Sequence, residues 1–351
     1  MIAGGSTQTA LPAPFAPSRP IRSRLALMMA IFGALALVTC AVAPLVGSSP
    51  INLRRALDSS IPFDSNVDAQ ILFIARLPRV ITGALVGAAL AAAGVVFQAL
   101  LRNPLATPFT LGVSAGASLG AMLVIILGGT IAVGPWSPVP AASLAGAGLA
   151  AAIVYALANG PRRVMSTTVL LLAGVTLNAF FSALIVFVQY LADFAEVARA
   201  ARWLMGDLDV GGFDPILAAL PLLAAAAIGI AFLPSSLNLL SISTDSASAR
   251  GVDVARVQRW AFITGSLATS AAVAVGGPIG FIGIIVPHLV RLIVGSDHRV
   301  LLPASALFGA AFLVGCDLLA RTLIAPVEIP VGVVTALLGG PFFLWMLVRR
   351  A

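Results

Sequence analysis

The sequence predicts an all-α polytopic membrane protein with about ten transmembrane helices. Hydrophobic residues make up 60% of the 351 positions, charged residues make up only 9%, and the mean hydropathy is +1.07. A soluble domain carries about 25% charged residues and cannot bury this much apolar surface. Apolar runs recur along the chain at lengths near the roughly 20 residues that a membrane-spanning helix needs.

The N-terminal region differs in composition from the rest of the chain. Residues 1–20 are rich in Pro, Ala, Ser and Thr, and the first apolar run, from Leu25 to Val46, follows three arginines. We expect residues 1–24 to form a disordered cytoplasmic tail and residues 25–351 to form one transmembrane domain. The first run has 22 residues, which is too long for a signal-peptide core and suits a spanning helix.

Nine further apolar runs complete the expected set. They lie at about 80–101, 111–133, 139–158, 165–192, 216–233, 260–275, 278–294, 300–320 and 329–348. The segment "GGPIGFIG" (276–283) is either a turn or an interruption of one span, and we expect two short helices there. Glycines at four-residue spacing, such as Gly83 and Gly87, predict close packing between helices.

The distribution of arginines predicts the orientation in the membrane. With ten spans and both termini in the cytoplasm, the cytoplasmic side carries 13 arginines and 3 acidic residues, and the outer side carries 7 arginines and 10 acidic residues. This excess of positive charge on the cytoplasmic side agrees with the positive-inside rule. Arg76 and Arg79, in the stretch "RLPR", fall on the outer side against the trend. We expect Pro78 between them to lie in the first turn of the next helix.

Composition excludes several classes of function. All 20 basic residues are arginine, so the chain contains neither a nucleotide-binding P-loop nor a Schiff-base lysine. His288 and His298 have no cysteine or carboxylate cluster at ligand spacing, so we expect no metal site. Cys40 and Cys316 lie in apolar segments and are interpreted as buried thiols. The arginines separate apolar runs, which indicates the lipid bilayer as a partner and not nucleic acid.

Polar side chains interrupt the run at 165–192. Thr176, Asn178, Ser182 and Gln189 lie within it, and the last three share one helix face because their spacings are four and seven. Either these side chains form hydrogen bonds between helices, or they line a polar, uncharged translocation path.

Charged groups inside the predicted spans are scarce. Asp317 and Arg321 are the nearest case, and they lie four positions apart at the outer end of their run. A structural ion pair explains them as well as a functional role does.

The longest cytoplasmic connection runs from about 234 to 259. We expect a short helix there that is capped by Asp245 or Ser246 and followed by Arg250, Arg256 and Arg259. The connection is either a solvated loop or a docking surface for a cytoplasmic partner that supplies energy.

Several long motifs resemble those of one transporter family. They are "RLPRVITGALVGAALAAAGVVFQALLRNPLATPFTLGVSAGASLGA" (76–121), "LLLAGVTLNAFFSAL" (170–184), "RWLMGDL" (202–208), "GPIGFIGIIVPHLVRLIVGSDHRVLLPASALFGA" (277–310) and "EIPVGVVTALLGGPFFLWML" (328–347). On these motifs the chain resembles the FecCD-like permease subunits of type II ABC importers. That family imports iron-siderophores, haem and cobalamin.

The resemblance implies a type II importer permease fold of ten helices and a set of partners. These partners are a second permease subunit, two cytoplasmic ATPases that bind ATP-Mg, and an external substrate-binding protein. The chain itself is expected to hold no cofactor. In the family, helices equivalent to 167–191 and 329–348 lie near the path. Arg76, Arg79 and Arg321 occupy the positions at which family arginines contact acidic residues of the binding protein.

The resemblance also implies that the cytoplasmic connection couples to the ATPases, through residues that include Ser243, Asp245, Ser246, Ala247, Arg250 and Gly251. The family has Leu-Gly before and after the coupling helix. This chain has "IS" at 242–243 and "RG" at 250–251 instead, which leaves the detailed geometry open.

The leading hypothesis is therefore an ATP-driven importer permease in the cytoplasmic membrane that carries a bulky iron chelate such as a ferric siderophore. Haem or cobalamin import by the same kind of permease is the first alternative. An ion-coupled secondary transporter is the alternative from another class. Whether the two permease subunits are identical stays open.

Overall fold

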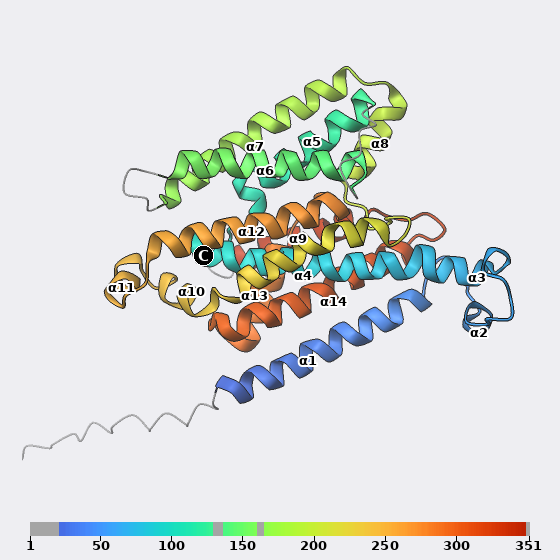
Figure 1. Cartoon of the computed structure of the whole chain (residues 1–351), viewed down its shortest axis with the longest axis horizontal. Coiled ribbons are helices and arrows are strands. Elements are labelled where there is room, and N and C mark those ends of the chain that lie inside the picture. Colours follow the sequence, from blue (N-terminus) through green and yellow to red (C-terminus); the bar gives the residue numbers. More distant parts are fainter. Residues whose placement is uncertain (1–20, 129–135, 160–164, 349–351) are drawn as a thin grey trace, which may run out of the picture.

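In the computed structural model, residues 21–128, 136–159 and 165–348 are described, and all regular secondary structure in these ranges is helical (Figure 1). A single antiparallel bridge joins Asn159 and Met165. Residues 1–20 of the predicted tail lie outside the described residues, as do the arginine pairs at 162–163 and 349–350.

Each of the ten predicted runs corresponds to a helix in the described chain. These helices are α1 (Ile21–Val42), α4 (Leu77–Leu101), α5 (Val113–Leu127), α6 (Pro138–Ala158), α7 (Thr167–Tyr190), α9 (Asp214–Ala231), α12 (Val254–Gly276), α13 (Ile282–Val294), α14 (His298–Thr322) and α15 (Val331–Val348). Six helical segments are long and apolar enough to cross a membrane, and α5, α13 and α15 are shorter apolar helices.

Shorter elements connect these helices. They are η1 (Ala43–Leu45), α2 (Leu53–Ala56), η2 (Phe63–Ser65), α3 (Val67–Gln70), η3 (Ile71–Arg76), η4 (Pro108–Leu111), α8 (Phe194–Leu204), α10 (Pro234–Leu240) and α11 (Thr244–Ala249). Several predicted boundaries differ from the structure by a few residues, and two examples bear on the predicted tail and loop. α1 begins at Ile21, four residues before the predicted run, and α12 begins at Val254, inside the predicted loop.

The segment 260–294 forms two helices, as predicted. α12 ends at Gly276, and Gly277 follows with a φ of +70°, a conformation that glycine adopts without a steric penalty. Phe281 has a φ of +66°, and the chain then enters α13. Two residues in the left-handed region therefore separate two helices that a continuous apolar pattern could have joined.

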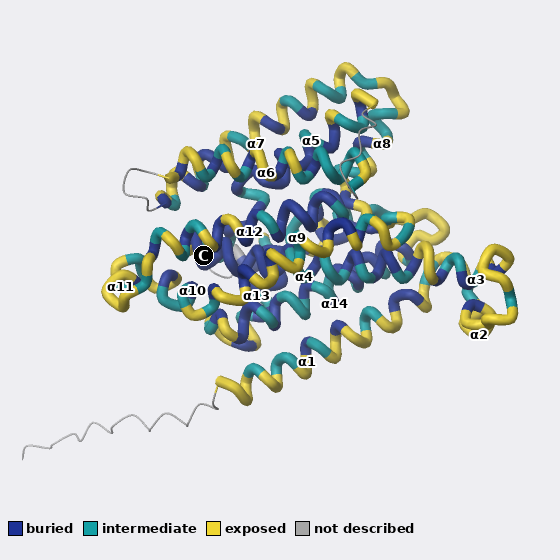
Figure 2. Tube along the Cα trace, viewed as in Figure 1, coloured by how far each residue is buried: buried dark blue, intermediate teal, exposed yellow. Residues whose placement is uncertain are grey.

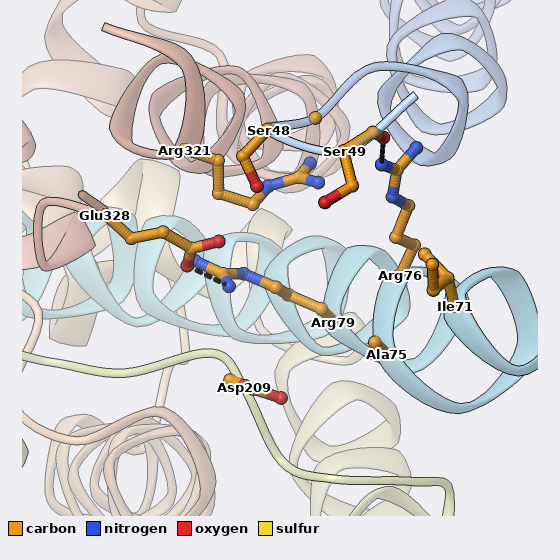
Figure 3. Close-up of a pocket in the computed structure, with 10 residues that line it drawn as sticks. Ser48, Ser49, Ile71, Ala75, Arg76, Arg79, Asp209, Arg321 and Glu328 are labelled. Carbon is orange, nitrogen blue, oxygen red and sulfur yellow. Dashed lines mark hydrogen bonds and ion pairs between the residues drawn. The ribbon is translucent and has the colours of Figure 1, made fainter. Parts of the chain in front are cut away.

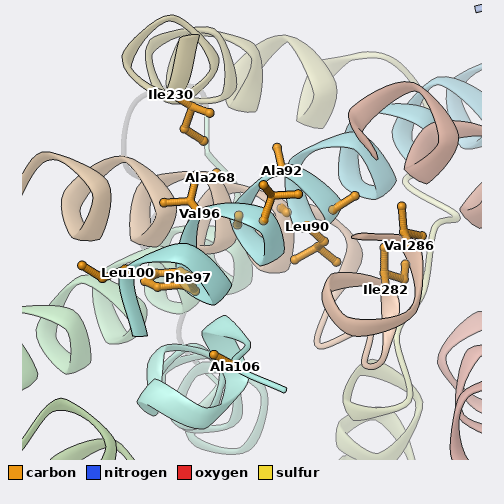
Figure 4. Close-up of a cluster of buried hydrophobic side chains, with 14 of the residues drawn as sticks. Leu90, Ala92, Val96, Phe97, Leu100, Ala106, Ile230, Ala268, Ile282 and Val286 are labelled. Carbon is orange, nitrogen blue, oxygen red and sulfur yellow. The ribbon is translucent and has the colours of Figure 1, made fainter. Parts of the chain in front are cut away.

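The helices form two layers (Figure 1). One layer contains α5, α6, α7 and α8, and the other contains α4, α9, α12, α13 and α14, with α1 packed along α14. α4 lies at the centre, and most of its residues are buried (Figure 2). Figure 4 shows part of the apolar core around it, which includes Leu90, Val96 and Phe97. A helix that is apolar on every face, as α4 is, belongs in such an interior position.

The predicted glycine seams are confirmed. A Cβ atom added to Gly87 on α4 would lie 2.2 Å from the carbonyl oxygen of Gly309 on α14. One added to Gly120 on α5 would lie 2.1 Å from the carbonyl oxygen of Ala142 on α6. These backbones approach so closely that only glycine fits, which is how small residues promote helix packing in membranes.

Candidate functional site

Charged side chains gather at one end of the bundle, on the right of Figure 1. We call this group the arginine end, and it consists of Arg76, Arg79, Asp317, Arg321 and Glu328. The three arginines come from the start of α4, the turn before it and the last turn of α14 (Figure 3). The structure therefore brings the three predicted docking residues together, although they are far apart in the sequence.

Asp317 lies at the centre of the arginine end and is 1% exposed. Its carboxylate accepts a hydrogen bond of 2.9 Å from Nε of Arg79 and forms an ion pair of 3.0 Å with Nε of Arg321. Arg79 also donates from NH1 to Glu328 across 2.7 Å. Of the two alternatives for Asp317 and Arg321, the structural ion pair is present, and Arg79 joins it from another helix.

The remaining donors of these arginines bind the backbone that follows α1. Arg321 donates from NH1 to the carbonyl of Val46 and from NH2 to that of Ala43, each across 3.2 Å. Arg76 donates to the carbonyls of Pro44, across 3.0 Å, and of Ser49. Carbonyls at a helix C-terminus lack helical partners and attract cations. The arginines therefore fasten the end of α1 to α4 and α14.

Local backbone features position Arg76. The turn η3 is a π-helix, and it leads without interruption from α3 into α4, where Pro78 lies in the first turn as expected. Gly47 provides the room opposite, because a Cβ atom there would lie 2.8 Å from NH2 of Arg76.

The charged groups of the arginine end are unevenly paired. Its three guanidinium groups face the two carboxylates of Asp317 and Glu328. In the described chain no carboxylate forms an ion pair with Arg76, whose side chain bonds only to backbone carbonyls. A cavity of about 170 Å³ opens among these groups, and Asp209 also lines it (Figure 3). With Asp209 included, the formal charges around the cavity balance, and Arg76 is the guanidinium of this group for which the described chain shows no carboxylate partner.

Sequence reasoning missed Glu328. It lies seven positions after Arg321, in the connection to α15. It is the first residue of the motif at 328–347, but no role was assigned to it. No periodicity links it to Arg79, which is 249 positions away.

The opposite end of the bundle, on the left of Figure 1, contains α10 and α11. We call residues 234–259 the loop end. The predicted caps of its short helix were wrong, because Ser243 is the N-cap of α11 and its side chain accepts a hydrogen bond of 2.9 Å from the amide of Ser246. Asp245 lies in the first turn, where a negative charge is favourable. The serine that replaces the family's glycine therefore supplies the cap.

The predicted coupling residues divide by exposure. Asp245, Arg250 and Gly251 are exposed, whereas Ala247 is fully buried and anchors α11 to the bundle. Gly251 has a φ of +80°, which explains why glycine is kept at this second position.

Asn238 on α10 joins the loop end to α14. Its amide donates to Asp297 across 2.8 Å and accepts from the amide of His298 across 2.8 Å. Arg299 and Asn238 donate hydrogen bonds to the carboxylate of Asp297 and hold its pKa well below the usual range. Asp297 is also the N-cap of α14.

The four predicted path residues lie on α7, in the outer helix of the upper layer (Figure 1). Thr176, Asn178 and Ser182 are exposed and Gln189 is half-buried. None of their side chains forms a hydrogen bond within the described part of the chain, which counts against hydrogen bonding between helices of the same subunit. Their exposed neighbours are large and apolar, such as Val175, Phe180 and Phe187. This helix face is available to a second molecule.

Comparison with known proteins gives concordant matches. The model of the FecCD transport family matches residues 33–349. The chain is 42% identical over 275 residues to the cobalamin import system permease protein BtuC of Halobacterium salinarum, which covers 78% of this chain and 72% of the relative. It is 39% identical over 283 residues to the hemin transport system permease protein HmuU of Yersinia pestis, covering 78% and 82%.

A solved structure agrees in fold. It is described as an inward-facing conformation of a metal-chelate type ABC transporter, and it is 31% identical to this chain with a TM-score of 0.77. The match covers 93% of this chain and 100% of that chain.

Proposed function

From the premise that the chain belongs to the FecCD transport family of ABC importer permeases, we propose that it carries a bulky iron chelate, a ferric siderophore, across the cytoplasmic membrane. The observation that carries this proposal is the family match over residues 33–349 together with the shared fold. Relatives are named for cobalamin and hemin, so these two ligands are the competing substrates.

We further propose that two permease subunits face each other across α7 and α15. Both helices expose large apolar side chains, including Leu172 and Phe180 on α7 and Leu337 and Trp345 on α15. Thr176, Asn178, Ser182 and Gln189 would then line the path with polar, uncharged groups, which suits a large chelate that must pass without tight binding. The observed exposure of three of these side chains supports this arrangement.

An external binding protein is proposed to dock at the arginine end. Arg76 supports this proposal, since its charge has no carboxylate partner in the described chain. Arg79 and Arg321 contribute to the electrostatic potential at this end, but both already form ion pairs with Asp317. This assignment places the arginine end outside the cell and both chain termini in the cytoplasm, in agreement with the arginine distribution.

The docking proposal is tested with Arg76→Glu and the binding protein in a salt-dependent pull-down. Opposing like charges should weaken docking most at low salt. Arg55→Glu, at an exposed arginine of α2 near the same end, is the matched control. Docking by Arg76→Glu that is unchanged and insensitive to salt would refute the role of this residue.

Two cytoplasmic ATPases are proposed to bind the loop end through the exposed residues Asp245, Arg250 and Gly251. The chain has no lysine and hence no P-loop of its own, so ATP-Mg must bind to those partners. The exposed surface of α11 and its anchoring by Ala247 support a rigid contact of this kind.

Transport is tested in liposomes that contain the permease, its ATPases and the binding protein. We expect uptake of a radiolabelled ferric siderophore to require ATP and to exceed uptake of haem and cobalamin. Preferential uptake of haem or cobalamin would reassign the substrate. Uptake that collapses with the proton gradient while ATP is held constant would indicate an ion-coupled carrier instead.

A further inference from the structure

A groove opens on the side of the bundle between α6, α9 and α12. Its volume is about 440 Å³, and its lining includes Gly148, Tyr155, Leu222, Phe262, Ser266 and Ser270. Of these helices, α6 and α9 are long and apolar enough to span the membrane, and α12 has 23 residues.

The groove exists because α6 and α9 contact different faces of α12. On one side, Nε1 of Trp260 donates to the carbonyl of Gly229 on α9 across 3.1 Å. On the other side, the ring of Phe262 packs against Tyr155 of α6 with a centroid distance of 6.1 Å. Between these two contacts, α12 borders the groove with Ile263, Ser266 and Ser270.

Small residues keep the groove open. A Cβ atom added to Gly148 of α6 would meet nothing within 4 Å, in contrast to Gly120 and Gly146 of the α5–α6 seam. The hydroxyl of Ser266 lines the groove, and its residue is 5% exposed, yet it has no hydrogen-bond partner in the described chain. Thr264 and Thr269 on the same helix instead bond to carbonyls four positions earlier. The groove is thus a space that the protein itself does not fill.

Arg259 precedes the groove on α12 and lies on the same side of the helix as residues that line it. At about 100° per residue, Arg259, Ile263, Ser266 and Ser270 lie within roughly 60° of one another on α12. Nε of Arg259 donates weakly to the carbonyl of Ala255 across 3.4 Å. The terminal nitrogens of this guanidinium have no hydrogen-bond partner within the described ranges, so they are free to bind an anion.

The dimensions match one leaflet of a bilayer. From Arg259 to Ser270 α12 rises about 16 Å, at about 1.5 Å per residue. Half of the roughly 30 Å hydrocarbon core is about 15 Å. A guanidinium at headgroup depth therefore stands above an apolar groove that reaches the centre of the membrane, and arginine side chains extend toward headgroups in this way.

We propose that this groove binds one anionic phospholipid, with its phosphate on Arg259 and one acyl chain along α12 between α6 and α9. The lipid belongs to the leaflet at the loop end. It completes the packing between the two helical layers, because α6 belongs to one layer and α9 to the other. The proposal depends on the membrane location of the chain and is independent of the transported substrate.

The test measures lipid retained by the detergent-purified chain in native mass spectrometry, with dioleoylphosphatidylglycerol and dioleoylphosphatidylcholine as probes. We expect Arg259→Gln to reduce phosphatidylglycerol binding about fivefold, since one basic residue at a membrane surface contributes an effect of this size. Binding of phosphatidylcholine should change little. Gly148→Leu, which fills the groove without loss of helix propensity, should reduce binding of both lipids.

Two variants serve as matched controls. Arg256→Gln removes a charge one turn away that is exposed and paired with Asp253 across 3.4 Å. Gly315→Leu adds the same side chain at another open glycine, on α14. Neither should change lipid retention.

Three results would overturn the proposal. The first is equal loss of lipid in the control variants. The second is equally tight binding of glycerophosphoglycerol, which has the headgroup but no acyl chains and would identify a simple anion site. The third is a change of oligomeric state in Gly148→Leu without a change in lipid retention, which would mean that a second protein chain covers the groove.

Discussion

The arginine end and the loop end hold the chain together by contacts of different range. At the arginine end, Arg79 and Asp317 are 238 positions apart, and Arg321 bonds to carbonyls 275 and 278 positions away. At the loop end, Ser243 and Asp253 are helix N-caps, and the side chain of each accepts a hydrogen bond from the amide three residues later. The longer contacts there join Asn238 to Asp297, 59 positions away, and Gln258 to Met165, 93 positions away.

This difference shows at which end the positions of the helices relative to one another are fixed by buried charges. A buried charge cannot leave its partner without a large desolvation cost, so α1, α4 and α14 are fixed relative to one another at the arginine end. Locally capped helices keep their hydrogen bonds when they move as a unit. The loop end has helices that are capped by neighbouring residues, and Ala247, Asn238 and Gln258 fasten it to the bundle.

Removal of the central carboxylate of the arginine end should cause the largest loss of stability. Asp317→Ala leaves Arg321 without a carboxylate partner and Arg79 with Glu328 alone. We expect a loss of about 3–5 kcal/mol in the free energy of unfolding, measured by chemical or thermal unfolding in detergent. Arg55→Ala, which breaks the exposed pair with Asp68, should cost at most about 1 kcal/mol. Similar losses in both variants would show that the buried ion pairs contribute no more to stability than the exposed pair does.

The pH dependence of folding stability should show how much the ionised carboxylate of Asp297 stabilises the loop end. Its pKa is lowered in the folded chain by hydrogen bonds from Arg299 and Asn238. The ionised carboxylate therefore adds stability above the unfolded pKa of about 3.9, and this stability is lost as the pH falls below that value. Asp297→Asn keeps a good helix cap but should lower the melting temperature at pH 7.

The same variant should also lose less stability than the wild type between pH 5 and pH 3, which are approximate limits set by the ordinary carboxyl pKa. Asp245→Asn, at an exposed position of α11, is the control and should follow the wild type. Parallel pH curves for wild type and Asp297→Asn would contradict the assignment.

The cap at Ser243 should have the smallest effect. Ser243→Ala removes the acceptor for the amide of Ser246 and should destabilise α11 by about 1 kcal/mol, whereas Ser243→Gly should cost only a few tenths. Hydrogen exchange at the amide of Ser246 measures the difference. Equal exchange in the two variants would mean that packing of Ala247 and not the cap holds the helix.

Features encoded by neighbouring residues were predictable. The ten helices followed from apolar runs, and the four-residue spacing of Asp317 and Arg321 on one helix offered their ion pair as one of two alternatives. The seam at Gly87 followed from glycine spacing. Helix caps were less predictable. Several polar residues near Ser243 can accept a hydrogen bond from a first-turn amide, and the backbone conformation decides which of them becomes the N-cap.

The sequence by itself determined that this chain is a helical membrane protein with ten apolar segments, since hydrophobic length and helical period are local properties. Its motifs indicated the transporter family. Only the tertiary structure decided that Glu328 pairs with Arg79, that the arginines bind carbonyls after α1, and that a groove opens between α6, α9 and α12. These contacts depend on which helices become neighbours, and packing across the whole bundle sets that arrangement.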